Sequence, residues 1–125
     1  MSVLTLVHDR LSVTTLLFML ALGAWGLLNY FRGEGITGSY WGALVIAEAL
    51  VLLEGLLGAT LFASGHRPAR TTIHILYGFV MVLSIPGAFS YTKGRTGRGE
   101  MLIYALVALF LAGVTIRARL TGAGV

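Results

Sequence analysis

The sequence predicts an all-α integral membrane protein, a four-helix bundle in which successive helices alternate up and down. Two observations support this prediction. Of the 125 residues, 57% are hydrophobic and only 11% are charged, whereas soluble domains contain roughly 25% charged residues. The apolar residues also form long unbroken runs without the polar stripe of a soluble helix or strand. A chain of this length is expected to form one transmembrane domain, residues 1–125.

Four helices are expected at about 8–31, 40–63, 70–91 and 100–118. A helix needs roughly 20 residues to cross a hydrocarbon layer of ~30 Å, and the first three segments reach that length. The apolar part of the fourth is short, and it can span the layer if Glu100 and Arg117 lie at headgroup level. The connections are short and rich in glycine and charge, so consecutive helices should be antiparallel neighbours.

Charge and cysteine content narrow the range of partners. The chain has no cysteine, which excludes disulfide bonds and thiolate metal sites. Its net charge of +4 is spread over the connections, which indicates contact with lipid headgroups and excludes nucleic acid as a partner. Four cations lie on one side of the expected bundle, and five lie on the side of both termini: Arg10, Arg67, Arg70, Arg117 and Arg119. This small excess predicts that both termini are cytoplasmic.

Each expected helix has a row of residues, several of them small or polar, at spacings of three and four. In lipid, small and polar residues mark the contacts between helices. The rows of the first, third and fourth helices contain His8, Thr15 and Asn29, then His74 and Tyr77, then Met101 and Tyr104. The second row is Trp41, Val45, Glu48, Leu52, Gly55 and Ala59. We expect all four rows to face one another, and Pro86 to kink the third helix.

Two glutamates, Glu48 and Glu54, lie within the second expected span. An acidic residue at the centre of a membrane helix costs about 2.5 to 3.5 kcal/mol, so each carboxyl should be protonated or hydrogen-bonded. A separation of six residues corresponds to about 120° around a helix, which excludes a catalytic pair. For Glu48 the alternatives are proton or cation handling and a hydrogen bond to a Ser, Thr, Tyr or Asn of a neighbouring helix or subunit. For Glu54, on a face with Ala47 and Gly58, we expect contact with another protein chain.

Histidine suggests a specific cofactor. In a bundle with alternating helices, the first and third are parallel and diagonal, so His8 and His74 should project toward a shared centre. Two facing imidazoles are the axial ligands of a b-type haem. Three arginines on the same side could pair with its propionates: Arg10, Arg67 and Arg70. In this arrangement, though in no contiguous motif, the chain resembles small membrane cytochrome b bundles.

The expected depth of the two histidines argues against haem. His74 lies about one turn inside Arg70, whereas His8 lies outside Arg10, which leaves a vertical mismatch of several ångström. A deeper insertion of the first helix would remove the mismatch. In the alternative interpretation His8 forms a hydrogen bond beside Asp9, and His74 bonds to a residue of a neighbouring helix.

The sequence contains no nucleophile elbow, phosphate-binding glycine loop or metalloprotease motif. We therefore expect a non-enzymatic subunit of an oligomeric or multi-component membrane assembly, such as a respiratory or photosynthetic complex, without a cofactor. Its partners would be lipid and other membrane chains or further copies of itself. The alternatives are the haem-binding electron-transfer bundle and a proton-coupled small-molecule carrier that uses Glu48. The chain is similar to dimeric four-span exporters in length and span number, but its first span, Leu11 to Phe31, lacks their acid.

Overall fold

The computed structural model describes residues 3–123, and these residues form four α-helices and no strand. The helices are α1 (Val3–Phe31), α2 (Gly38–Ala63), α3 (Thr71–Thr92) and α4 (Arg98–Gly122). All four are long and apolar enough to cross a membrane. The expectation of an all-helical fold with four such helices is therefore confirmed. α1 begins five residues before the expected start, and α4 ends four residues after the expected end.

Local signals in the sequence explain where the helices begin and end. The side chain of Thr37 accepts a hydrogen bond from the backbone N–H of Tyr40, which caps the start of α2. α1 ends before Gly33, whose φ of 76° is in the left-handed region that glycine adopts without strain. Gly97 precedes α4, and its backbone N–H donates a 3.3 Å hydrogen bond to Oε1 of Glu100, which caps the start of this helix.

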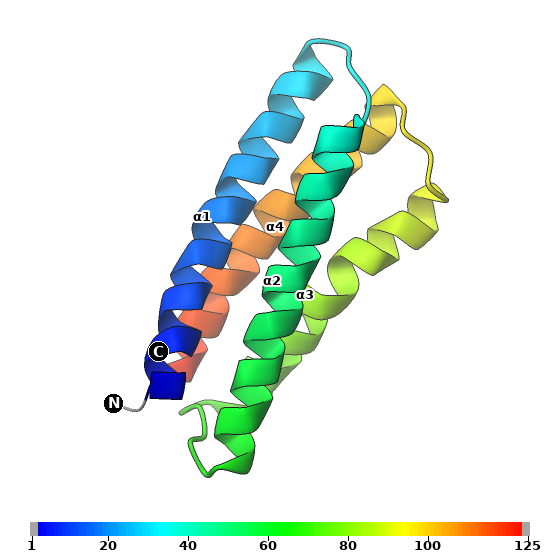
Figure 1. Cartoon of the computed structure of the whole chain (residues 1–125). Coiled ribbons are helices and arrows are strands. Elements are labelled where there is room, and N and C mark those ends of the chain that lie inside the picture. The colour runs from blue at the N-terminus through cyan, green and yellow to red at the C-terminus, as the bar shows by residue number, and fades with distance from the viewer. Residues whose placement is uncertain (1–2, 124–125) are drawn as a thin grey trace.

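α4 lies at the centre of the packing, between α1 and α3. Its start lies beside the end of α1, because Arg98 donates a hydrogen bond of 2.8 Å to the carbonyl oxygen of Tyr30. Its end lies beside the start of α1, because Arg119 and Asp9 are 3.2 Å apart. The start of α1 and the end of α4 therefore lie at one end of the bundle, as Figure 1 shows.

α3 packs mainly on α4 and makes little contact with α2. Near the end of α3, the hydroxyl groups of Thr92 and Tyr104 are 3.0 Å apart in the buried interior. Near its start, His74 Nδ1 lies 2.7 Å from the carbonyl oxygen of Ala118. Pro86 lies inside α3, and toward Thr92 this helix leans away from α2 (Figure 1). The side of the bundle between α2 and α3 is consequently the most open.

The predicted inward rows of α1 and α4 are buried in the structure. On α1 the interior residues include Thr15, Met19, Leu22, Gly26 and Asn29, and on α4 they include Met101, Tyr104, Ala108, Leu111 and Thr115. On α3 the middle of the row is buried, at Met81 and Ala88, whereas Tyr91 is exposed.

The predicted inward row of α2 is wrong. Val45 and Leu52 of that row are 67% and 50% exposed. The face of α2 that is buried contains instead Tyr40, Leu44, Ala47 and Val51. The reason is that α2 is apolar on every side, so hydrophobic periodicity cannot identify its inner face. The packing is set by Tyr40, whose hydroxyl donates a 2.9 Å hydrogen bond to the carbonyl oxygen of Leu22.

Candidate functional site

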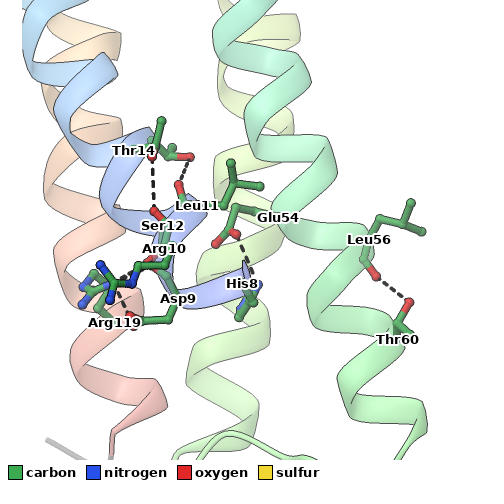
Figure 2. Close-up of polar contacts among 11 residues, drawn as sticks. His8, Asp9, Arg10, Leu11, Ser12, Thr14, Glu54, Leu56, Thr60 and Arg119 are labelled. Atoms are coloured by element: carbon green, nitrogen blue, oxygen red, sulfur yellow. Dashed lines mark hydrogen bonds and ion pairs between the residues drawn. The ribbon is translucent and has the colours of Figure 1, made fainter. Parts of the chain in front are cut away.

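The candidate functional residues occur in three places: the end of the bundle that holds the termini, the groove between α2 and α3, and the interior. At the first place, α1 presents His8 and α2 presents Glu54, and the two side chains point toward each other (Figure 2). His8 Nδ1 is 3.3 Å from Glu54 Oε1, and the side chains are only 27% and 13% exposed. This is an ion-pair distance when the imidazole is protonated. The ring of His8 also lies over Gly58, where an added Cβ would be 3.3 Å from it.

This contact corrects the expectation for Glu54. Its carboxyl faces His8 of the same chain rather than another protein chain. The face that it shares with Ala47 and Gly58 is turned toward α1, because small residues there allow the two helices to approach closely. Glu54 therefore gives no evidence for an oligomer.

A second polar contact at this end joins α1 to α4. Arg119 forms an ion pair of 3.2 Å with Asp9 and also donates a hydrogen bond to the hydroxyl of Ser12 (Figure 2). This contact differs from the expectation from the sequence, in which Asp9 lies beside His8 alone. A signal was nevertheless present: Asp9 and Arg119 are opposite charges at the same expected end of antiparallel helices.

His74 is held on the other side of α4. Its Nδ1 lies 2.7 Å from the carbonyl oxygen of Ala118 and 3.4 Å from the hydroxyl of Thr121. The ring lies against Gly122, where an added Cβ would be 3.1 Å from it. His74 thus has the neighbouring-helix partner that the structural alternative expects.

The two histidines lie at similar depth in the bundle. Asp9, next to His8, contacts Arg119, and His74 contacts Ala118, so both imidazoles are level with the same turn of α4. Within the bundle, the two rings therefore do not show the vertical offset that the sequence suggested.

The arginines expected near a haem are exposed: Arg10, Arg67 and Arg70. The guanidinium of Arg67 lies over the ring of Phe62, 4.1 Å from its centroid. The backbone N–H of Arg70 donates to the carbonyl oxygen of Thr121. All three lie at the same end of the bundle as the two histidines, as the sequence predicted, and the structure does not gather them around one point.

Glu48 is separated from all of these groups. It lines a groove of 390 Å³ between α2 and α3, together with apolar residues of both helices: Trp41, Leu44, Val45, Ala49, Leu52, Ile85, Pro86 and Phe89. Its Oε1 is buried and has no hydrogen-bond partner in the part of the chain that the structure describes. The expected hydrogen bond from a Ser, Thr, Tyr or Asn of a neighbouring helix is therefore not formed within residues 3–123.

The remaining polar side chains expected inside the bundle have structural partners. Asn29 is buried, and its amide donates to the sulfur of Met101 at 3.9 Å. Tyr77 is half-buried against the apolar core. A second groove, of 410 Å³, runs between α3 and α4 beside Ser84, Gly87, Ala88, Leu106 and Phe110.

No group of three or more His, Asp or Glu side chains within residues 3–123 could hold a metal ion. Comparison of the chain with protein-family models, curated proteins and solved structures finds no match.

Proposed function

We propose that the protein is a small, non-enzymatic integral membrane subunit that packs against a helix of another membrane chain. In this proposal its four helices cross the bilayer in alternating directions, with both termini on the cytoplasmic side. The partner helix occupies the groove between α3 and α4. The observation that supports the proposal is the shape of this groove.

Three small residues and Tyr91 line the α3 side of the groove, and larger apolar residues line the α4 side. Ser84 and Ala88 are one turn apart on α3 with Gly87 between them, and Leu106 and Phe110 project from α4. A Cβ added at Gly87 would meet no atom within 4 Å, so this glycine is not required by packing inside the chain. Spacing of small residues by four is the pattern at which membrane helices approach each other closely. A partner helix would therefore pack closely against Ser84, Gly87 and Ala88.

The subunit proposal predicts that filling the groove prevents association. Gly87→Leu adds a side chain where the partner backbone would lie, so the variant should elute from size exclusion as a single 13.3 kDa chain with its detergent. The wild-type protein, extracted from native membranes in a mild detergent, should elute with a partner chain or a second copy. Gly113→Leu is the matched control, because Gly113 is also exposed and open but lies outside the groove. A wild-type protein that elutes alone contradicts the proposal.

A second candidate function is binding of a b-type haem by His8 and His74, and a specific observation favours it. Nδ1 of each ring faces an acceptor, the carboxyl of Glu54 for His8 and the carbonyl oxygen of Ala118 for His74. Histidines that ligate metals usually donate one ring N–H to such an acceptor and bind the metal through the other nitrogen. The similar depth of the two rings adds support. Bound haem would supply electron transfer.

The haem candidate predicts sharp visible absorption bands in the reduced protein, and their loss in His74→Gln, because glutamine does not replace an imidazole ligand. His8→Gln should have the same effect. If His74 is only a structural hydrogen-bond partner, the wild-type protein shows no such band. His74→Ala then costs about 0.6 to 2 kcal/mol, the range for hydrogen bonds between membrane helices, and His74→Gln still folds. An absorption spectrum without haem bands refutes this candidate.

A further inference from the structure

Arg10 is a lone cation in an otherwise apolar row on the outer side of α1. Side chains at spacings of three and four lie on one face of a helix, and the row that contains Arg10 is exposed: Val3, Leu6, Arg10, Val13, Leu17 and Leu20. His8, which faces Glu54 on α2, is about 200° away around the helix (Figure 2). Apolar surface therefore extends along α1 on both sides of Arg10, as expected of a face that meets lipid.

Arg10 has no counterion within the described chain. Its guanidinium forms no ion pair and no hydrogen bond with any residue in the range 3–123. Two acids lie at this end of the bundle, and both face other groups. Asp9 is 3.2 Å from Arg119, and Glu54 Oε1 is 3.3 Å from His8 Nδ1. Because an arginine stays charged in any protein environment, the counterion of Arg10 must come from the surroundings.

The length of α1 places Arg10 at the level of lipid headgroups. The opposite boundary of the membrane is marked near Phe31, where the helix ends and Arg98 donates to the carbonyl oxygen of Tyr30. About 20 residues of helix cross a hydrocarbon layer of ~30 Å, and counted back from Phe31 they end at about Leu11. Arg10 follows directly beyond this point, where the phosphates of a phospholipid lie.

We propose that Arg10 binds the phosphate of an anionic phospholipid, and that an acyl chain of this lipid lies along Val13, Leu17 and Leu20. A guanidinium offers a fork of N–H donors that matches two phosphate oxygens. The apolar row gives the lipid a contact that a soluble phosphate lacks, since an acyl chain runs from the phosphate into the bilayer along this row. The site rests on the membrane position in the proposed function, and it is independent of the partner helix.

The charges around Arg10 favour a lipid with a net negative charge. Arg67 and Arg117 are exposed at the same end of the bundle, and neither forms an ion pair with a described acid. The carboxylates described at this end already face Arg119 and His8, which leaves the ammonium group of a zwitterionic lipid without a strong partner. Each arginine near a membrane surface contributes about a fivefold preference for anionic lipid.

The experiment uses the full chain in liposomes of equal parts phosphatidylglycerol and phosphatidylcholine with identical acyl chains. The protein is extracted in a mild detergent, and native mass spectrometry counts the lipids of each kind retained per chain. We expect the wild-type protein to retain at least about five times more phosphatidylglycerol than phosphatidylcholine. Inorganic phosphate at the same concentration as the lipid should not displace it, because phosphate has no acyl chain to lie on the apolar row.

Three variants test the role of the guanidinium. Arg10→Gln should lower the ratio of the two retained lipids by about fivefold. Arg10→Lys keeps the charge but loses the fork of donors, so its ratio should be intermediate. Arg32→Gln is the matched control, because it removes the same charge just past the opposite end of α1, outside the apolar row, and should change the ratio by less than about twofold. Circular dichroism of each variant establishes that the helices persist.

Other outcomes overturn the proposal. Equal retention of the two lipids by the wild-type protein would show that the site does not select an anionic lipid. A preference that survives Arg10→Gln, or that falls equally in Arg32→Gln, would assign it to the net charge of the chain. Displacement by inorganic phosphate would identify a site for a soluble anion. Retention of neither lipid would exclude a lipid site, and loss of a co-eluting chain in Arg10→Gln would then identify an acid of that chain as the counterion. A wild-type protein that elutes alone from size exclusion contradicts the partner helix and leaves these expectations unchanged.

Discussion

Replacement of Gly26 by alanine should strongly destabilise the packing of α1 against α2 and α4. A Cβ at this position would lie 2.5 Å from Tyr40 Oη and 2.8 Å from the Cβ of Ala105. The Tyr40 hydroxyl, which donates to the carbonyl oxygen of Leu22, would have to move, and α4 would be pushed from α1. Overpacking and the loss of a buried hydrogen bond together should lower the free energy of unfolding by about 2–4 kcal/mol.

The free energy of unfolding is measured in mixtures of a mild detergent and dodecyl sulfate. Tryptophan fluorescence reports on this site, because the ring centroids of Trp25 and Tyr40 are 4.9 Å apart. Gly113→Ala is the control. Gly113 is exposed on α4, and no atom lies within 4 Å of an added Cβ. Alanine should raise helix stability there by up to about 1 kcal/mol. The two substitutions should therefore have opposite signs, and equal stability of both variants would contradict the packing between α1, α2 and α4.

The architecture could be predicted from the sequence because the signals for membrane helices are strong and local. Long apolar runs separated by segments such as Lys93–Gly99 fix the number and approximate position of the helices. The inner face of α1 was also predictable, because its polar residues, such as Thr15 and Asn29, occur on one side in an otherwise apolar helix.

The arrangement of the candidate sites could not be predicted in the same way. α2 has no polar stripe, so its rotation was inferred from Glu48, which lies at a groove rather than in the core. The true inner face depends on long-range contacts of Tyr40 and on the small residue Ala47, which no local pattern marks. The contact of His8 with Glu54 follows from this rotation together with the early start of α1.

The pair of His8 and Glu54 should show strong energetic coupling. Glu54→Leu removes the carboxyl and leaves the imidazole, only 27% exposed, without its partner. Breaking a fully buried ion pair costs about 3–5 kcal/mol, and partial exposure reduces the expected loss here to about 1–3 kcal/mol. His8→Leu should cost a similar amount, since it leaves the carboxyl of Glu54 unpaired.

The double variant His8→Leu with Glu54→Leu distinguishes a specific pair from two independent losses. Apolar residues of similar volume often replace a buried pair at little cost, so the double variant should recover most of the stability lost in either single one. The coupling free energy from the double-mutant cycle should be about 1–3 kcal/mol, measured by the same detergent unfolding. The matched cycle of His8→Leu with Glu48→Leu should be additive, because Glu48 lies in the groove between α2 and α3 and makes no contact with His8. Glu54 Oε1 lies 3.3 Å from His8 Nδ1, so the carboxyl must respond when the imidazole is removed. Additive effects in the first cycle would therefore show that α2 is rotated differently about its axis near Glu54. Coupling of equal size in both cycles would show the same.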